Sequence, residues 1–90
     1  MEGDNATRYL QQHLAANVRR RREKLGLSQE AFAEHAAIDL RFYKHVEAAE
    51  RDVALSTLVR LARALSCNPA ALLRPTRPVV RKPGRPKKRN

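Results

Sequence analysis

The feature that most constrains the fold is a helix-start pattern that occurs twice, eleven residues apart. In each copy an apolar residue precedes a small polar residue, and an aromatic residue follows the polar one by four positions. The two copies are Leu27, Ser28 and Phe32, then Ile38, Asp39 and Tyr43. Such a polar residue caps a free backbone N–H, while the apolar pair closes over the first helical turn. The pattern therefore predicts two short helices joined by only two or three residues at 36–38, and helices joined so tightly cross at a large angle.

A long helix is predicted before this pair, over residues 8–25. Apolar residues recur there at the spacing of one helix face, with Thr7 as the expected N-cap and Gly26 as the expected stop. The residues of this face are Leu10, Leu14, Val18 and Leu25. The pattern indicates an amphipathic first helix.

Two more helices are predicted after the pair. Leucines at 55, 58, 61 and 65 indicate a fourth helix, and Asn68 followed by Pro69 is typical of the start of a short fifth one that carries Leu72 and Leu73. No segment shows a strand pattern. The predicted fold is an all-α, five-helix bundle over residues 8–73, preceded by a disordered N-terminus at 1–7.

The last 17 residues differ sharply from the rest of the chain. Ninety residues allow one domain at most, and the net charge is +10. Residues 74–90 hold eight basic residues and no acidic one, whereas residues 1–73 hold eleven basic and nine acidic ones. Prolines at 75, 78, 83 and 86 prevent a helix there. We therefore expect a disordered cationic tail that attracts polyanions such as nucleic acid, an acidic membrane or an acidic protein.

Several classes of protein are excluded by what the chain lacks. One cysteine cannot form an internal disulfide, no apolar run approaches a membrane span, and residues 1–7 do not have the layout of a secretory signal. The histidines and Cys67 lack metal-ligand spacing, and no glycine-rich phosphate loop is present. We expect a cytoplasmic protein that is not an enzyme and needs neither cofactor nor metal.

Residues 27–73 carry the resemblance to a known family. The opening at residues 27–30, Ala33 where two helices pack closely, the Val46-Glu47 pair and the apolar run at 58–65 occur in the order and spacing of one domain type. The segment resembles the helix-turn-helix domain of the Cro and phage-repressor type, and the first helix extends the match to residues 8–73. The resemblance implies a bacterial or phage transcription regulator, with a repressor as the expected form, which binds double-stranded DNA in the nucleoid and could act as a homodimer.

The resemblance also implies which residues meet DNA. The third helix would enter the major groove, anchored by Tyr43 and Val46, with its polar face toward the bases. That face consists of Leu40, Arg41, Lys44 and His45. Arg41 suits guanine and Leu40 a thymine methyl, while Lys44 suits either guanine or a phosphate. Ser28, Gln29 and Arg51 would contact the DNA backbone, and Glu47 would pair with Arg22 as part of the scaffold.

Three positions depart from the family pattern. Ala37 and Ala49 stand where turn glycines are usual, so one of these turns is expected to be built differently, because a left-handed alanine costs on the order of 1 kcal/mol. Arg21 stands where an apolar residue is usual. These differences affect the expected angle of the third helix rather than the fold.

The tail contains a second resemblance, to an AT-hook. Its core is Gly84-Arg85-Pro86, flanked by Arg81, Lys82, Lys87, Lys88 and Arg89, although Pro83 stands where a fuller hook has another arginine. The resemblance implies binding in the narrow minor groove of A/T-rich DNA. A nonspecific polycation and a nuclear-import or linker segment are the alternatives for the tail.

For the whole chain, two functions compete with transcription regulation. The chain could be an antitoxin or bridging factor that binds a protein partner through its tail. It could also be an architectural nucleoid protein with little sequence preference.

Overall fold

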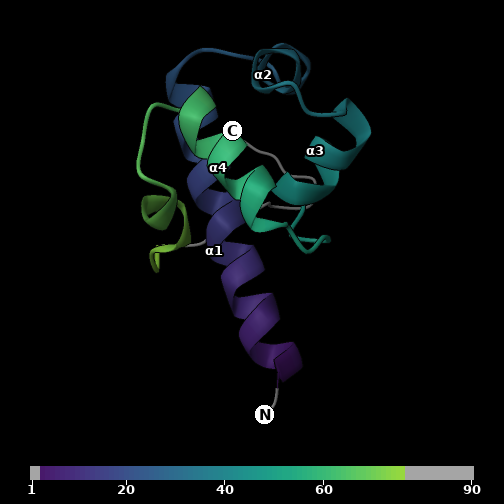
Figure 1. Ribbon diagram of the computed structural model, residues 1–90, viewed down its shortest axis with the longest axis vertical. Coiled ribbons are helices and arrows are strands. Elements are labelled where there is room, and N and C mark those ends of the chain that lie inside the picture. Colours follow the sequence, from purple (N-terminus) through teal and green to yellow (C-terminus); the bar gives the residue numbers. More distant parts are fainter. Residues whose placement is uncertain (1–2, 77–90) are drawn as a thin grey trace, which may run out of the picture.

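The helices of the computed structural model follow the sequence pattern closely. The structure describes residues 3–76 and contains four α-helices and one 3-10 helix (Figure 1). They are α1 (Gly3–Lys24), α2 (Gln29–Ala36), α3 (Leu40–Glu47), α4 (Leu55–Ala64) and η1 (Pro69–Leu73). The all-α prediction is confirmed, since no strand occurs in residues 3–76.

The first helix begins earlier than expected. It starts at Gly3, so the predicted N-cap at Thr7 and the disorder expected for residues 3–7 are wrong. Nothing in residues 4–7 breaks a helix, and extending an existing helix costs far less than nucleating one. The N-terminal half of α1 projects from the other helices (Figure 1), and Leu10 is exposed there, as is Leu25 at the other end, whereas Leu14 and Val18 are buried.

The predicted N-caps of α2, α3 and the last helical segment are confirmed. Ser28 Oγ accepts from Ala31 N at 3.0 Å, and Asp39 Oδ2 accepts from Phe42 N at 3.0 Å. Asn68 Oδ1 accepts from Ala70 N at 2.8 Å. Leu27 and Ile38 pack against the core that contains Phe32 and Tyr43, as the helix-start pattern requires.

The fifth helix is a 3-10 helix and not an α-helix, so the expected five-helix bundle has four α-helices. The segment has only five residues, and Ala71 N donates to Asn68 O at 2.9 Å, three residues back. Pro69 has no N–H to donate, and such short segments commonly adopt this tighter geometry.

All four α-helices end in the same backbone motif. A left-handed residue follows the helix, with φ of 75° at Gly26, 59° at Ala37, 61° at Ala49 and 55° at Ser66. Its N–H and that of the next residue reach back to two of the last carbonyls, as in the Schellman motif. The expectation that one alanine turn is built differently is therefore wrong, because the two hydrogen bonds are made at both turns despite the side-chain penalty.

One core holds the helices together. Its largest fully buried side chains are Val18, Phe32, Tyr43, Leu61 and Leu72, one from each of the five elements. In Figure 1, α2 is seen nearly end-on while α3 lies across the view, so the two short helices cross steeply as predicted. This crossing leaves one side of α3 uncovered.

The segment after η1 returns to α1. Asn17 Nδ2 donates to the carbonyls of Leu72 and Arg74 at 2.9 and 3.0 Å. Thr76 N donates to His13 Nδ1 at 3.1 Å, and Arg20 donates to Thr76 Oγ1 at 2.7 Å. The expectation that the tail is free from residue 74 onward is therefore wrong for residues 74–76, which polar groups of α1 hold in place.

Candidate nucleic-acid interface

Helix α3 divides into a buried face and an exposed face. Tyr43, Val46 and Glu47 are buried, which fixes the helix on the core as the sequence predicted for the first two. At 100° per residue the opposite arc runs from Leu40 through Lys44 and Arg41 to His45. Arg41 and Lys44 are exposed, and Leu40 and His45 are half-buried. The structure therefore brings the four expected base-reading residues onto one accessible surface.

A shallow hollow marks the start of this surface. It is lined by Asp39, Leu40, Arg41 and Lys44. Asp39 uses one carboxylate oxygen to cap the helix, and the two cations lie beside the apolar side chain of Leu40. The arrangement suits the edge of a base pair, which combines hydrogen-bonding atoms with a methyl group.

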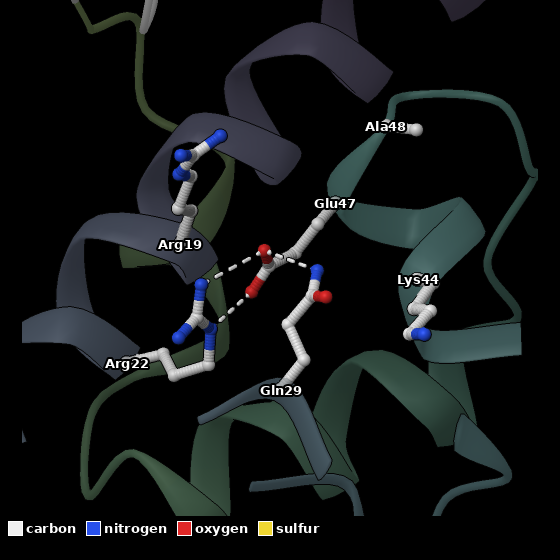
Figure 2. Close-up of a pocket in the computed structure, with 6 residues that line it drawn as sticks. All are labelled: Arg19, Arg22, Gln29, Lys44, Glu47 and Ala48. Carbon is white, nitrogen blue, oxygen red and sulfur yellow. Dashed lines mark hydrogen bonds and ion pairs between the residues drawn. The ribbon is translucent and has the colours of Figure 1, made fainter. Parts of the chain in front are cut away.

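A buried polar cluster locks the orientation of α3. Arg22 of α1 pairs with Glu47, with Nε at 2.6 Å from Oε2 and Nη2 at 3.2 Å from Oε1 (Figure 2). The Tyr43 hydroxyl also donates to Glu47, and Gln29 Nε2 donates to Oε1 at 3.0 Å. Arg22 reaches the Leu27 carbonyl as well, at 2.7 Å. The expected Arg22–Glu47 pair is present, and it ties α1, α2 and α3 together.

The cluster shifts the ionisation of its members. Burial alone would raise the pKa of Glu47, but hydrogen bonds from Arg22, Tyr43 and Gln29 outweigh it and lower that pKa below 4.5. The hydrogen bond to Glu47 raises the pKa of Arg22, although burial opposes it. Burial, and then the bond to Glu47, raises the pKa of the Tyr43 phenol. Glu47 and Arg22 are therefore both charged at neutral pH.

A cleft opens beside this cluster, between α1, the start of α2 and the end of α3. Figure 2 shows its lining, which consists of Arg19, Arg22, Gln29, Lys44, Glu47 and Ala48. Arg19 is not among the residues expected from the sequence, because the run of arginines at 19–22 passes around the whole helix. Only the packing of α1 against α3 shows that Arg19 faces the cleft together with Arg22.

The residues expected to contact the DNA backbone lie in two places. Ser28 and Gln29 begin α2 beside the cleft, with the Ser28 hydroxyl capping the helix and the Gln29 amide bound to Glu47. Arg51 lies elsewhere, with its guanidinium carbon 5.9 Å from the centre of the Phe42 ring. The three residues therefore do not form one group.

Glu50 is a neighbour of this surface that the sequence analysis missed. Its Oε1 lies 2.8 Å from Nδ1 of His45. A separation of five residues is not a regular helical spacing, and the contact depends on the left-handed turn at Ala49. The predicted tail residues, Arg81, Lys82, Gly84, Arg85, Pro86, Lys87, Lys88 and Arg89, lie outside the described residues.

Residues 3–76 contain no group of three or more His, Cys, Asp or Glu side chains that could hold a metal ion. No described helix is long and apolar enough to cross a membrane.

Comparison with known proteins identifies relatives of this chain. A helix-turn-helix family model matches residues 18–72. The control protein C.SmaI of Serratia marcescens is 45% identical over 60 residues, which cover 67% of this chain and 71% of that protein.

Two solved structures are similar in fold and sequence. The hypothetical transcription factor NHTF from Neisseria has a TM-score of 0.71 at 35% identity, over 73% of this chain and 76% of that one. The restriction-modification controller protein C.AhdI from Aeromonas hydrophila has a TM-score of 0.66 at 32% identity, over 69% and 94%. The chain belongs to the helix-turn-helix family of DNA-binding transcription regulators, of the Cro and phage-repressor type.

Proposed function

We propose that this protein controls the transcription of restriction-modification genes by reading a specific operator with the exposed face of α3. The observation that carries the proposal is the grouping of Leu40, Arg41, Lys44 and His45 on one accessible surface of a helix whose other face is locked by Glu47. The relatives named as control or controller proteins support the choice of genes.

Individual roles follow from position on this surface. Arg41 is the main base reader, since its exposed guanidinium can bridge O6 and N7 of guanine. Lys44 lines both the hollow of α3 and the cleft that contains Arg19 and Gln29. This position favours a phosphate contact for Lys44 over a base contact. Ser28 and Gln29 at the start of α2 would contribute N–H groups to the same phosphate.

The proposal is tested by selecting bound sites from random double-stranded DNA and comparing Arg41→Ala with Arg63→Ala. Both changes remove one exposed arginine, but Arg63 lies on α4, outside the hollow and the cleft. Arg41→Ala should lose about 1 to 3 kcal/mol of preference for the selected site over scrambled DNA, and Arg63→Ala should lose none. Equal preference in both variants would contradict the proposal.

A dimer would place two copies of α3 on two half-sites. Leu72 is not available for a dimer contact, because it is fully buried and closes the monomer core. Exposed apolar side chains instead surround a groove between α1 and α4, and they include Leu10 and Leu55. Arg51 and Asp52 line the same groove. A two-fold arrangement would bring the Arg51 of each copy toward the oppositely charged Asp52 of the other copy. We place the dimer contact there.

The tail adds a second DNA contact in this proposal. Arg85 and its neighbours would lie in the minor groove of A/T-rich DNA beside the operator. The docking of residues 74–76 on α1 supports this, since it holds the start of the tail at one place on the domain.

A further inference from the structure

The C-terminal end of α3 differs from the ends of the other α-helices. In the Schellman motif that ends each of these helices, the residue after the left-handed one commonly makes an apolar contact with the helix. At α1, α2 and α4 that residue is Leu27, Ile38 or Cys67, and each packs against the core. At α3 it is Glu50, which is exposed. The helix that we assign to base reading is thus the one that carries a charged residue at this position of the motif.

Glu50 is attached to one partner by both its backbone and its side chain. Its N–H donates to the His45 carbonyl at 3.0 Å, and its Oε1 lies 2.8 Å from His45 Nδ1. The side chains are 40% and 60% exposed. A polar contact this exposed adds little to stability, so stability does not explain why the two residues meet.

The chemistry of the pair determines which hydrogen bonds remain for a ligand. A carboxylate only accepts, so Nδ1 of His45 must carry the proton that lies between the two groups. A neutral imidazole has one N–H, and Nε2 is then left as an acceptor. Without Glu50, either nitrogen could carry that proton.

We infer that Glu50 positions His45 so that Nε2 accepts a hydrogen bond from an exocyclic amino group, which selects adenine or cytosine at one operator position. In the major groove these two bases present an amino group, at N6 and N4, whereas guanine and thymine present acceptors. His45 is at the edge of the exposed arc of α3, one turn after Arg41. The inference rests on the proposed function, and it makes Glu50 a positioning residue for specificity.

The first test measures the tautomer without DNA. Two-bond 1H–15N correlation spectra of the protein, taken at a pH where His45 is neutral, should show the proton on Nδ1. In Glu50→Ala the proton should move toward Nε2, which water favours in a free imidazole. A wild-type His45 with its proton on Nε2 would overturn the inference.

The second test measures specificity. Site selection with wild type, Glu50→Ala and His45→Ala should show that both variants lose about five-fold in preference for adenine or cytosine at the same single position, while the guanine preference assigned to Arg41 remains. Glu34→Ala, which removes an exposed acid of α2, controls for charge and should keep both preferences. Thermal unfolding of each variant confirms that it is folded.

The outcomes separate this inference from the proposed function. If the wild type selects a specific sequence and Glu50→Ala keeps all of its base preferences, the inference is overturned while the proposed function stands. A wild type that enriches no sequence overturns the proposed function, and the inference with it.

Discussion

At the scale of single residues, Glu47 is the side chain that connects three helices. It accepts hydrogen bonds from Arg22 on α1, Gln29 on α2 and Tyr43 on its own helix, and it is only 9% exposed. A carboxylate with this many donors is both buried and charged. The position of α3, the helix that we propose reads DNA, therefore depends on one ionised side chain.

Removing the partner of this carboxylate should be far more costly than removing a neighbouring arginine. Arg22→Ala leaves Glu47 buried without its main partner and should lower the free energy of unfolding by about 3 to 5 kcal/mol. Arg19→Ala breaks an exposed pair with Glu23, at 3.1 Å, and should cost no more than about 1 kcal/mol. Urea unfolding followed by circular dichroism measures both, and similar losses would show that the cluster does not hold α3.

The same residue predicts a dependence of stability on pH. The pKa of Glu47 is lower in the folded protein than its usual 4.5. The charge of Glu47 therefore stabilises the fold fully above pH 4.5, and this contribution is lost as the pH falls through the folded-state pKa. Glu47→Gln has no such ionisation. The difference in unfolding free energy between wild type and Glu47→Gln should narrow below pH 4.5, and a difference that is constant from pH 7 to pH 3 would contradict the assignment.

At the scale of helices, the turns after α2 and α3 are built by backbone hydrogen bonds without a glycine. Ala37 has φ of 59° and Ala49 has φ of 61°, yet each makes the two hydrogen bonds that end its helix. Left-handed alanine costs about 1 to 2 kcal/mol, which the packing of the next helix must offset. The short link between α2 and α3 therefore carries a conformational penalty that glycine would remove.

Ala37→Gly should stabilise the domain. Relief of the left-handed penalty exceeds the added entropy of the unfolded chain, so the unfolding free energy should rise by about 0.5 to 1 kcal/mol. Ala31→Gly, at an exposed right-handed position of α2, should lower it by about 1 kcal/mol. Thermal melts of the two variants test this, and the same sign of change in both would refute it.

At the scale of the whole molecule, the tail and the domain should contribute separately to DNA affinity. Residues 77–90 hold seven of the nineteen basic residues, so their deletion should leave the helices folded and weaken DNA binding. A tail that meets four phosphates should take about four units from the slope of log affinity against log salt. Fluorescence anisotropy at several salt concentrations measures the slope. An unchanged slope would show that the tail does not touch DNA.

The proposed dimer is a second question at the scale of the whole molecule. Leu55 is 78% exposed on the groove between α1 and α4, and Leu55→Lys should shift sedimentation from dimer toward monomer because it places a charge in the contact. Val59 of α4 is 37% exposed, and Val59→Thr should change the sedimentation less. A wild type that sediments as a monomer both free and on a two-half-site DNA would refute the proposed contact.

The sequence by itself determined the order of the helical segments, the N-caps at Ser28, Asp39 and Asn68, and the polar face of α3. These features depend on neighbours a few residues apart, such as Ser28 with Ala31 or Asp39 with Phe42, and local hydrogen bonds and helical spacing decide them. The Arg22–Glu47 pair was expected from the family resemblance. Its central position between three helices was not.

Only the tertiary structure decided which groups meet across the fold. It turned Arg19 as well as Arg22 of a run of four arginines toward the cleft, held Thr76 against α1, and buried Leu72 while leaving Leu10 exposed. It also brought Glu50 onto His45 through a left-handed turn at an alanine, where the sequence favoured another geometry. The physical reason is that packing sets the angle between helices, and a periodic pattern identifies the face of a helix without showing what covers it.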